Sequence, residues 1–331
     1  MTTASLGLPF VDPALEGRVR TGLQEVERRL AACVDSDAPF VAEASRHLMS
    51  AGGKRFRPML VLVAAEFGDP GASGVVPAAV GVELTHLASL YHDDVMDEAD
   101  LRRGAKSANA RWDNSVAILT GDYLFGRASE VIADLGPAAV RIQARTFMRL
   151  VEGQVRETVG ARPAEDPLQH YLRVVADKTG SLISTSARYG ALMSGAGSGV
   201  EAVLTEFGER IGSAFQLSDD VIDVASETGE SGKTPGTDLR EGVSTLPVLI
   251  ARTSGDPGDA RLLELLDSDL TDDALHGEAL ALLREHSAMD EARAEVSRSA
   301  DEARKLLEEL PEIPARETLA GLCDLVVHRT A

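Results

Sequence analysis

Residues 80–97 read VGVELTHLASLYHDDVMD, and residues 207–223 read FGERIGSAFQLSDDVID. In both stretches apolar residues recur at three- and four-residue spacing, which is typical of a helix with a buried face. Each stretch ends in the pattern Asp-Asp-X-X-Asp, whose first and last carboxylates lie one turn apart on a helix. These pairs are Asp93 with Asp97 and Asp219 with Asp223. The stretches therefore predict two helices, each with a row of acidic side chains at the end of an inward-facing surface.

The two acidic rows indicate a metal site. Carboxylates that face a protein interior need cations beside them. The candidate ligands are hard oxygens without a Cys or clustered His site, which favours Mg²⁺ or Mn²⁺ over Zn²⁺. Because Mg²⁺ readily shares its coordination with phosphate oxygens, the rows predict a clamp for a diphosphate. A solvated acidic helix end is the alternative for one copy, but a second copy with identical spacing argues against it.

Helical periodicity continues along nearly the whole chain, and short Gly- and Pro-rich segments interrupt it. The predicted helices are 14–35, 37–51, 58–67, 75–98, 109–135, 137–159, 168–194, 200–226, 243–253, 260–286 and 290–310. No interruption has the length of a domain linker, so we expect one all-α domain over residues 1–331. Its core motifs lie within 48–250, and an acidic helical layer occupies 257–331.

Composition and charge limit the possible partners. The 331 residues are 44% apolar and carry 33 basic and 53 acidic side chains, for a net charge of −20. Such a surface repels nucleic acid and anionic membranes. The apolar run 59–65 is too short for a membrane helix, and the first twelve residues do not resemble a signal peptide. Two isolated cysteines, Cys33 and Cys323, suit a reducing compartment, so we expect a cytoplasmic protein.

A basic group stands out in this acidic chain. Residues 54–57 read KRFR after two glycines, and residues 102–104 read RRG shortly after the first acidic row. Arginine binds phosphate oxygens through two nitrogens and lysine adds a point charge, so Lys54, Arg57 and Arg103 are candidate anion ligands. Surface pairing of these arginines with glutamates is the alternative. For His86 the alternative is a histidine of the protein core.

Taken together, these segments resemble the trans-isoprenyl diphosphate synthase (polyprenyl synthetase) family. The resemblance covers most of the chain, from about residue 48 to 249. The segments that carry it are Gly52-Gly53-Lys54-Arg55-Phe56-Arg57-Pro58, His86-Leu-Ala-Ser-Leu-Tyr-His92-Asp93-Asp94, Asp100-Leu-Arg102-Arg103-Gly104, Gly121-Asp122-Tyr123-Leu124, Lys178-Thr179-Gly180, Gln216-Leu-Ser-Asp219-Asp220, and Gly232-Lys233-Thr-Pro-Gly236-Thr-Asp238-Leu-Arg-Glu-Gly242.

The resemblance implies the isoprenoid synthase fold, an antiparallel helix bundle around a deep central cavity, usually as a homodimer. It implies a prenyltransferase that ionises an allylic diphosphate with the help of three Mg²⁺ ions. The double bond of isopentenyl diphosphate then attacks the allylic cation. The catalytic residues that it implies are Asp93, Asp94, Asp97, Asp219, Asp220, Asp223, Lys178, Thr179 and Gln216, and the metal ligands are the same aspartates without Asp94.

The resemblance also divides the substrate contacts. Its isopentenyl diphosphate site matches Lys54, Arg57, His86 and Arg103, and its allylic side matches Arg102, Lys178, Thr179, Gln216 and Lys233. Family members often have a lysine after Glu-Gly in the last motif, where this chain has Val243. One contact to the allylic diphosphate is therefore expected to be missing.

Small residues precede the first acidic row on the same helix face. Ala88 and Ser89 lie five and four positions before it, and Thr85 follows one turn further back. A Phe or Tyr there would stop a growing hydrocarbon early. The first motif also lacks the two-residue insertion of bacterial farnesyl synthases, so we predict a product of about C30 to C50. Geranylgeranyl diphosphate is the alternative, because Phe125 or Tyr123 of a facing helix could set the floor.

Two rival functions come from other classes. A class I terpene cyclase would have a different second metal motif and a cavity rich in aromatic residues, whereas this chain repeats DDxxD and is 4% aromatic. A non-catalytic subunit of a heteromeric synthase would have lost the Asp motifs, and both are intact. The sequence therefore favours the synthase over both rivals.

Overall fold

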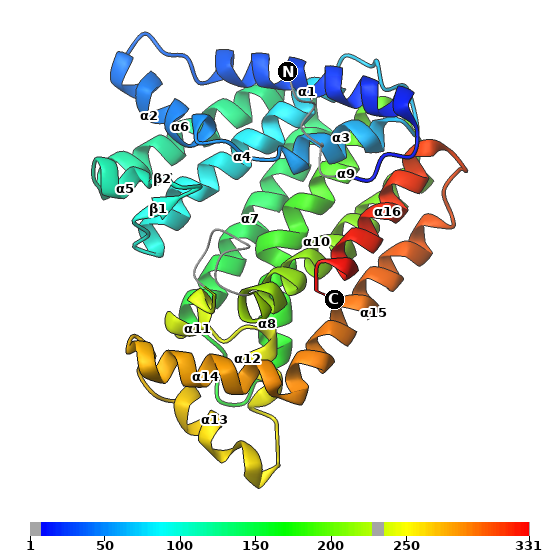
Figure 1. Ribbon diagram of the computed structural model, residues 1–331. Coiled ribbons are helices and arrows are strands. Elements are labelled where there is room, and N and C mark those ends of the chain that lie inside the picture. Colours follow the sequence, from blue (N-terminus) through cyan, green and yellow to red (C-terminus); the bar gives the residue numbers. More distant parts are fainter. Residues whose placement is uncertain (1–7, 227–234, 331) are drawn as a thin grey trace. The chain divides into compact units, whose positions relative to one another are not determined.

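The computed structural model describes residues 8–226 and 235–330, which form helices and one short β-hairpin (Figure 1). The elements are α1 (Pro13–Cys33), α2 (Pro39–Ser50), α3 (Phe56–Ala65), α4 (Val75–Met96), β1 (Leu101–Arg102), β2 (Ala105–Lys106), α5 (Ala108–Arg111), α6 (Asn114–Ala133), α7 (Pro137–Val159), α8 (Pro167–Val175), the π-helical turn η1 (Ala176–Gly180), α9 (Ser181–Ser194), α10 (Ser198–Ala225), α11 (Thr237–Arg240), α12 (Leu246–Ala251), the 3₁₀ turn η2 (Pro257–Asp259), α13 (Ala260–Leu266), α14 (Asp273–Glu285), α15 (Ser287–Leu307) and α16 (Pro314–His328). The predicted all-α fold is confirmed. Within the described ranges, no helix is both long and apolar enough to cross a membrane.

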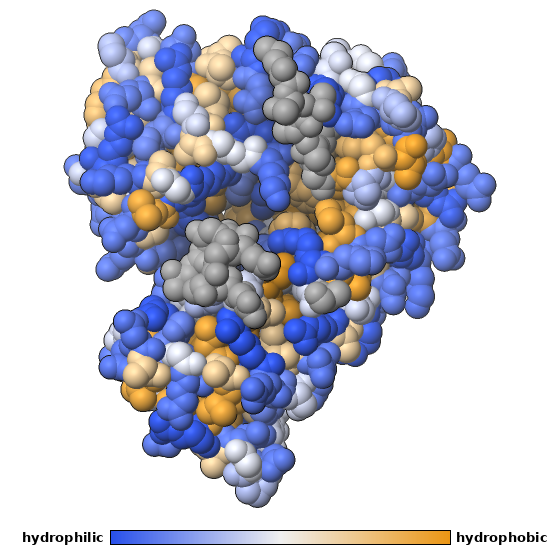
Figure 2. All heavy atoms as spheres, viewed as in Figure 1, coloured by the Kyte–Doolittle hydropathy of each residue, from blue (hydrophilic) through white to orange (hydrophobic). Residues whose placement is uncertain are grey.

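The chain divides into two compact units. The first comprises the described residues of 1–148, 182–208 and 307–321, and the second comprises those of 149–181, 209–306 and 322–331. Hydrophilic residues cover most of the face shown in Figure 2, as the charge count leads one to expect. The organisation as one domain stays a prediction.

In the first unit, α4 packs against α1, α3 and α6. Its sequence is apolar on nearly all sides between Val75 and Tyr91, which is typical of a helix surrounded by other helices. At Gly81 the absent side chain makes room for α6, because a Cβ atom there would lie 2.5 Å from Ile132 Cδ1. This packing fixes α4, and with it the first acidic row, inside the unit.

A two-residue hairpin follows α4 and was not predicted. Leu101 pairs with Lys106 and Arg102 with Ala105. Arg103 and Gly104 form the turn with φ of 54° and 76°. This is the left-handed conformation that tight hairpins favour. The hairpin turns the basic segment back toward the end of α4.

In the second unit, two predicted helices are interrupted. The helix predicted over 168–194 contains the π-helical turn η1, and the one predicted over 260–286 divides into α13 and α14. The second break arises because Asp269 accepts a hydrogen bond from Thr271 N (3.0 Å), and Asp272 accepts bonds from Ala274 N and Leu275 N that begin α14. Aspartates favour both roles, since their side chains bond to backbone N–H groups two or three residues on.

Helix α16 was also not predicted. Pro311 and Pro314 were interpreted as breakers, but Pro314 occupies the first turn of α16, where its missing N–H group is not needed. Leu319, Leu322, Cys323 and Val326 are buried, with the spacing of a helix face. The periodicity therefore extended beyond residue 310.

Candidate active site

The first acidic row lies in the last turn of α4, in the first unit. Asp97 N donates to Asp93 O (2.8 Å). This bond places the two residues one helical turn apart, as predicted. Asp93 is half-buried and Asp97 is exposed, whereas Asp94 between them is completely buried. The outer two carboxylates thus share a face, and the middle one points into the protein.

Asp94 is held by the unpredicted hairpin. Arg102 Nε donates to Asp94 Oδ1 at 2.5 Å, and Arg102 Nη2 lies 3.9 Å from Asp97 Oδ2. Asp94 Oδ2 is buried and accepts no hydrogen bond in the described part of the chain. Burial raises the pKa of the Asp94 carboxyl, and Arg102 opposes that effect. Arg102 is therefore the counter-ion of the first acidic row.

The basic residues of the first unit divide into paired and unpaired groups. Arg55 is neutralised, because it donates to Glu27 and its Nη1 lies 3.1 Å from Glu83 Oε1. Arg57 differs, since its Nε is buried without a hydrogen-bond partner among the described residues. Burial, together with the nearby Arg103, lowers the pKa of Arg57. A buried guanidinium with unused donor capacity is suited to binding an anion.

Arg103 and His86 lie close to Arg57. Arg103 donates to the backbone oxygens of Leu48 and Gly52. Burial and then the charges of Arg57 and Arg103 hold the pKa of His86 well below its usual range, so the imidazole is neutral. Lys54 is exposed beside this cluster. The structure therefore brings three of the four predicted isopentenyl-side residues into one electrostatic cluster.

The second acidic row lies on α10, in the second unit. Asp219 Oδ1 accepts a bond from Arg329 Nη2 at 2.5 Å. Asp223 accepts bonds from the backbone N–H groups of Thr237 (3.3 Å) and Asp238 (3.2 Å). The row is therefore joined to the start of α11 and to the C-terminal segment.

Asp220 is the buried carboxylate of this row. The Tyr171 hydroxyl donates to Oδ2, Gln216 Nε2 donates to Oδ1 (3.1 Å) and Leu246 N donates to Oδ2 (3.4 Å). Burial raises the pKa of Asp220 to about 6, although these hydrogen bonds lower it. Asp220 and Asp94 thus occupy equivalent buried positions in their rows.

The predicted allylic-side residues of the second unit form a hydrogen-bonded chain. Thr179 Oγ1 donates to Gln216 Oε1 at 3.1 Å, and Gln216 donates onward to Asp220. Lys178, the neighbour of Thr179, forms an ion pair with Glu157 on α7. Lys233 lies outside the described residues.

The acidic rows fit a hard divalent cation. Their donors are carboxylate oxygens, and in each row burial raises the pKa of one carboxyl, which an adjacent cation would reverse. Within residues 8–226 and 235–330, no three acidic, His or Cys side chains converge as a metal cluster. A Mg²⁺ ion that takes one or two carboxylates and completes its sphere with substrate oxygens and water needs no such cluster. The metal ligands stay a prediction.

The small residues before the first row line a buried face of α4. Ala88 and Thr85 are completely buried and Ser89 is half-buried. Thr85 Oγ1 donates to Gly81 O (2.8 Å) and accepts from Gln143 Nε2 (2.6 Å). Thr85 and Gln143 therefore form a polar contact about 12 Å along α4 from Asp93, at about 1.5 Å per residue.

Sequence reasoning missed Glu83, Tyr171 and Arg329. Glu83 had a detectable signal, because a glutamate in an otherwise apolar stretch needs a cation, and residues 54–57 supply one. Tyr171 and Arg329 lie 49 and 110 residues from their aspartate partners, so no local pattern connects them.

Comparisons with known proteins agree with this geometry. A family model described as polyprenyl synthetase matches residues 38–283. The nonaprenyl diphosphate synthase of Mycobacterium tuberculosis is 47% identical over 328 residues, which is 99% of this chain and 98% of that protein. A geranylgeranyl pyrophosphate synthase from Corynebacterium glutamicum, solved with calcium and isoprenyl diphosphate, has a TM-score of 0.89 at 46% identity and covers 98% of this chain and 99% of that chain. A decaprenyl diphosphate synthase from Rhodobacter capsulatus has a TM-score of 0.87 at 34% identity, with coverage of 96% and 99%. The matched residues include both acidic rows and the basic segment.

Proposed function

The chain belongs to the polyprenyl synthetase family, and on this premise we propose that it is a long-chain all-trans polyprenyl diphosphate synthase. It adds isopentenyl diphosphate head to tail to an allylic diphosphate. The observation that carries this function is the pair of DDxxD rows on α4 and α10 in a chain that is 47% identical to a nonaprenyl diphosphate synthase. A geranylgeranyl product is the second candidate, because a synthase of that product is 46% identical.

The acidic rows are proposed to bind the allylic diphosphate through divalent cations. Asp93, Asp97, Asp219, Asp220 and Asp223 would hold the metal, and three Mg²⁺ ions are proposed. Bound Mg²⁺ supplies neutralising charge for the departing diphosphate. The calcium and isoprenyl diphosphate in the Corynebacterium relative support a divalent metal beside a diphosphate in this family.

Protein cations are proposed to complete both diphosphate sites. On the allylic side, Arg102, Lys178 and Lys233 supply positive charge, while Thr179 and Gln216 order Asp220. On the isopentenyl side, Arg57, Arg103, Lys54 and His86 bind the second diphosphate. The buried Nε of Arg57, unpaired among the described residues, supports this assignment, because a diphosphate oxygen would satisfy it. Holding the isopentenyl double bond beside the allylic carbon supplies orientation and excludes water.

The test is incubation of the purified chain with labelled isopentenyl diphosphate and farnesyl or geranylgeranyl diphosphate, with and without Mg²⁺. Chromatography of the dephosphorylated products gives their length. We expect a Mg²⁺-dependent series that ends at one long product. A series that stops at C20 would support the second candidate. Hydrocarbon formed without isopentenyl diphosphate would support a terpene cyclase, and no reaction at all would support a subunit that needs a partner.

We also propose that the chain is a cytoplasmic homodimer that associates through α7. Helix α7 carries an exposed apolar stripe with helical spacing. Its members, with exposed fractions, are Val140 (44%), Phe147 (37%), Met148 (56%), Val151 (46%), Val155 (55%) and Val159 (74%). A contiguous apolar surface on an acidic protein is typical of an interface, and a second copy is a partner of matching chemistry.

Replacing both Val151 and Val155 with glutamate is expected to produce monomers, because four carboxylates would face one another across the interface. Light scattering after size-exclusion chromatography should then give about 35.0 kDa instead of twice that mass. Ala138→Glu, exposed in the first turn of α7 outside the stripe, is the control and should leave the dimer intact. A double variant that remains dimeric would place the interface elsewhere.

A further inference from the structure

The π-helical turn η1 carries two of the residues assigned to the allylic side. It spans Ala176–Gly180 and continues directly from α8 into α9. A π turn contains one residue more than an α-helical turn, so it rotates the following side chains relative to the preceding ones, and such turns are frequent at functional sites. The direction of Lys178 and Thr179 therefore depends on whether this turn is maintained.

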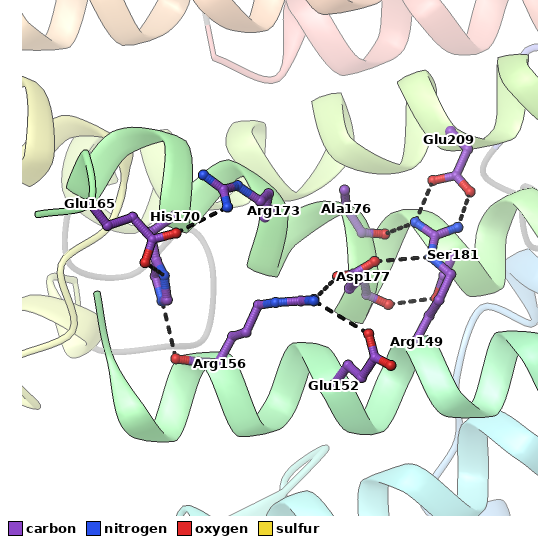
Figure 3. A network of polar contacts seen from close by, with 10 residues as sticks. All are labelled: Arg149, Glu152, Arg156, Glu165, His170, Arg173, Ala176, Asp177, Ser181 and Glu209. Carbon is purple, nitrogen blue, oxygen red and sulfur yellow. Dashed lines mark hydrogen bonds and ion pairs between the residues drawn. The ribbon is translucent and has the colours of Figure 1, made fainter. Parts of the chain in front are cut away.

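Two arginines of α7 hold the turn through Asp177 (Figure 3). Arg149 Nε donates to Asp177 Oδ1 at 2.9 Å, and Arg156 Nη1 donates to Asp177 Oδ2. The arginines lie seven residues apart, which is two turns of α7, so both reach the carboxylate from the same face. The Asp177 side chain is 16% exposed. This burial limits the screening of both pairs by solvent.

Arg149 extends this connection to a third element. Both of its terminal nitrogens donate to Glu209 on α10, with Nη2 lying 3.1 Å from Oε2, and Nη2 also donates to Ala176 O (3.3 Å). Hydrogen bonds to Glu209 are the largest cause of the raised pKa of Arg149, so the guanidinium is always charged. Arg149 thus links α7, η1 and α10, as Figure 3 shows.

Two glycines let the turn sit closely between these helices. A Cβ atom at Gly153 of α7 would lie 3.0 Å from Asp177 Cβ and 3.1 Å from Lys178 N. A Cβ atom at Gly180 would lie 3.3 Å from Glu209 O. These neighbours are not free to yield, because they are backbone atoms or are fixed by the ion pairs. The turn is therefore fixed by shape on both sides and by charge at its centre.

We propose that Arg149 and Asp177 are positioning residues for the allylic diphosphate. They hold the π turn in the register that directs Thr179 to Gln216 and leaves Lys178 beside it. Gln216 in turn donates to Asp220, so the effect of the clamp reaches the second acidic row without Arg149 or Asp177 contacting substrate. This inference rests on the proposed function and names two residues that act on its allylic side.

The test is Asp177→Asn, which keeps the shape and removes the charge that attracts both arginines. Misplacement of a binding group by about 1 Å costs up to about 10²-fold, so kcat/KM for the allylic substrate should fall by about 10- to 100-fold. The KM for isopentenyl diphosphate should stay within about twofold, because its residues belong to a different cluster. Calorimetry with a non-ionisable allylic thiolodiphosphate and Mg²⁺ should show the same loss of affinity.

Two comparisons separate positioning from a general loss of stability. Glu302→Gln breaks the exposed pair between Arg210 Nη1 and Glu302 Oε2 (2.7 Å) in the same unit. Because an exposed pair contributes little, this control should leave both KM values unchanged. In a Thr179→Val background, Asp177→Asn should add little further loss, since both changes interrupt one path.

Equal effects on both substrates, or full additivity with Thr179→Val, would overturn the proposal. If the wild-type chain makes no polyprenyl product, the proposed function fails, while the calorimetric comparison still tests the clamp.

Discussion

Replacing Asp93 with alanine is expected to lower kcat/KM for chain elongation by at least about 10³-fold, the order of loss when a main electrostatic contribution is removed from an active site. Asp93 and Asp97 are the two outward-facing carboxylates at the end of α4, and the buried Asp94 between them is already bonded to Arg102. No other carboxylate of this helix turn can replace Asp93. The rate is measured with farnesyl diphosphate and labelled isopentenyl diphosphate over a range of Mg²⁺ concentrations.

The matched control for this variant is Asp134→Asn. Asp134 is an exposed carboxylate that caps the end of α6 in the same unit, so its removal lowers the charge equally without touching the row. The control should keep wild-type kinetics. Asp219→Ala should resemble Asp93→Ala if both rows serve the same diphosphate. Wild-type turnover in Asp93→Ala would show that the first row does not bind the catalytic metal.

Ala88→Phe is expected to convert a long-chain product into a short one. Ala88 lies five positions before Asp93 on the buried face of α4, where an aromatic ring would fill the path of the growing hydrocarbon. Because the blocking group acts only after several condensations, turnover of a short primer should persist. Chromatographic sizing of the dephosphorylated product measures the change.

A buried phenylalanine also overpacks the helix, at a cost of about 1–3 kcal/mol, so the melting temperature is measured beside the product length. Ser89→Phe provides a second variant at a half-buried position and should shorten the product as well. Ala133→Phe, at an exposed position at the end of α6, should leave the length unchanged. An unchanged product in both Ala88→Phe and Ser89→Phe would refute the proposed ruler.

The predicted site was accurate where a short pattern determined the outcome. The i,i+4 placement of Asp93 and Asp97 follows from helix geometry, and the charge of residues 54–57 indicated an anion site. The same segment also shows the limit, because the sequence does not distinguish Arg55 from Arg57. Only packing makes Arg55 a structural ion-pair partner of Glu27 and Glu83 and leaves the Nε of Arg57 unpaired in the described chain.

The elements that were mispredicted share a physical cause. The π turn is stabilised by Arg149 and Arg156, which lie 28 and 21 residues before Asp177, and residues 168–194 by themselves have ordinary helical periodicity. The hairpin at 101–106 is only two residues wide on each side, too short for an alternating pattern.

The sequence by itself determined the all-α fold, the family and the two acidic rows, because helix periodicity and carboxylate spacing are local properties of the chain. The tertiary structure decided which charges remain available for a ligand. Asp94 is bound by Arg102, Asp220 by Tyr171 and Asp177 by two arginines of α7, and each pairing depends on how separate elements pack. The electrostatics of a site depend on burial and on distance in space, and these are set only when the helices pack.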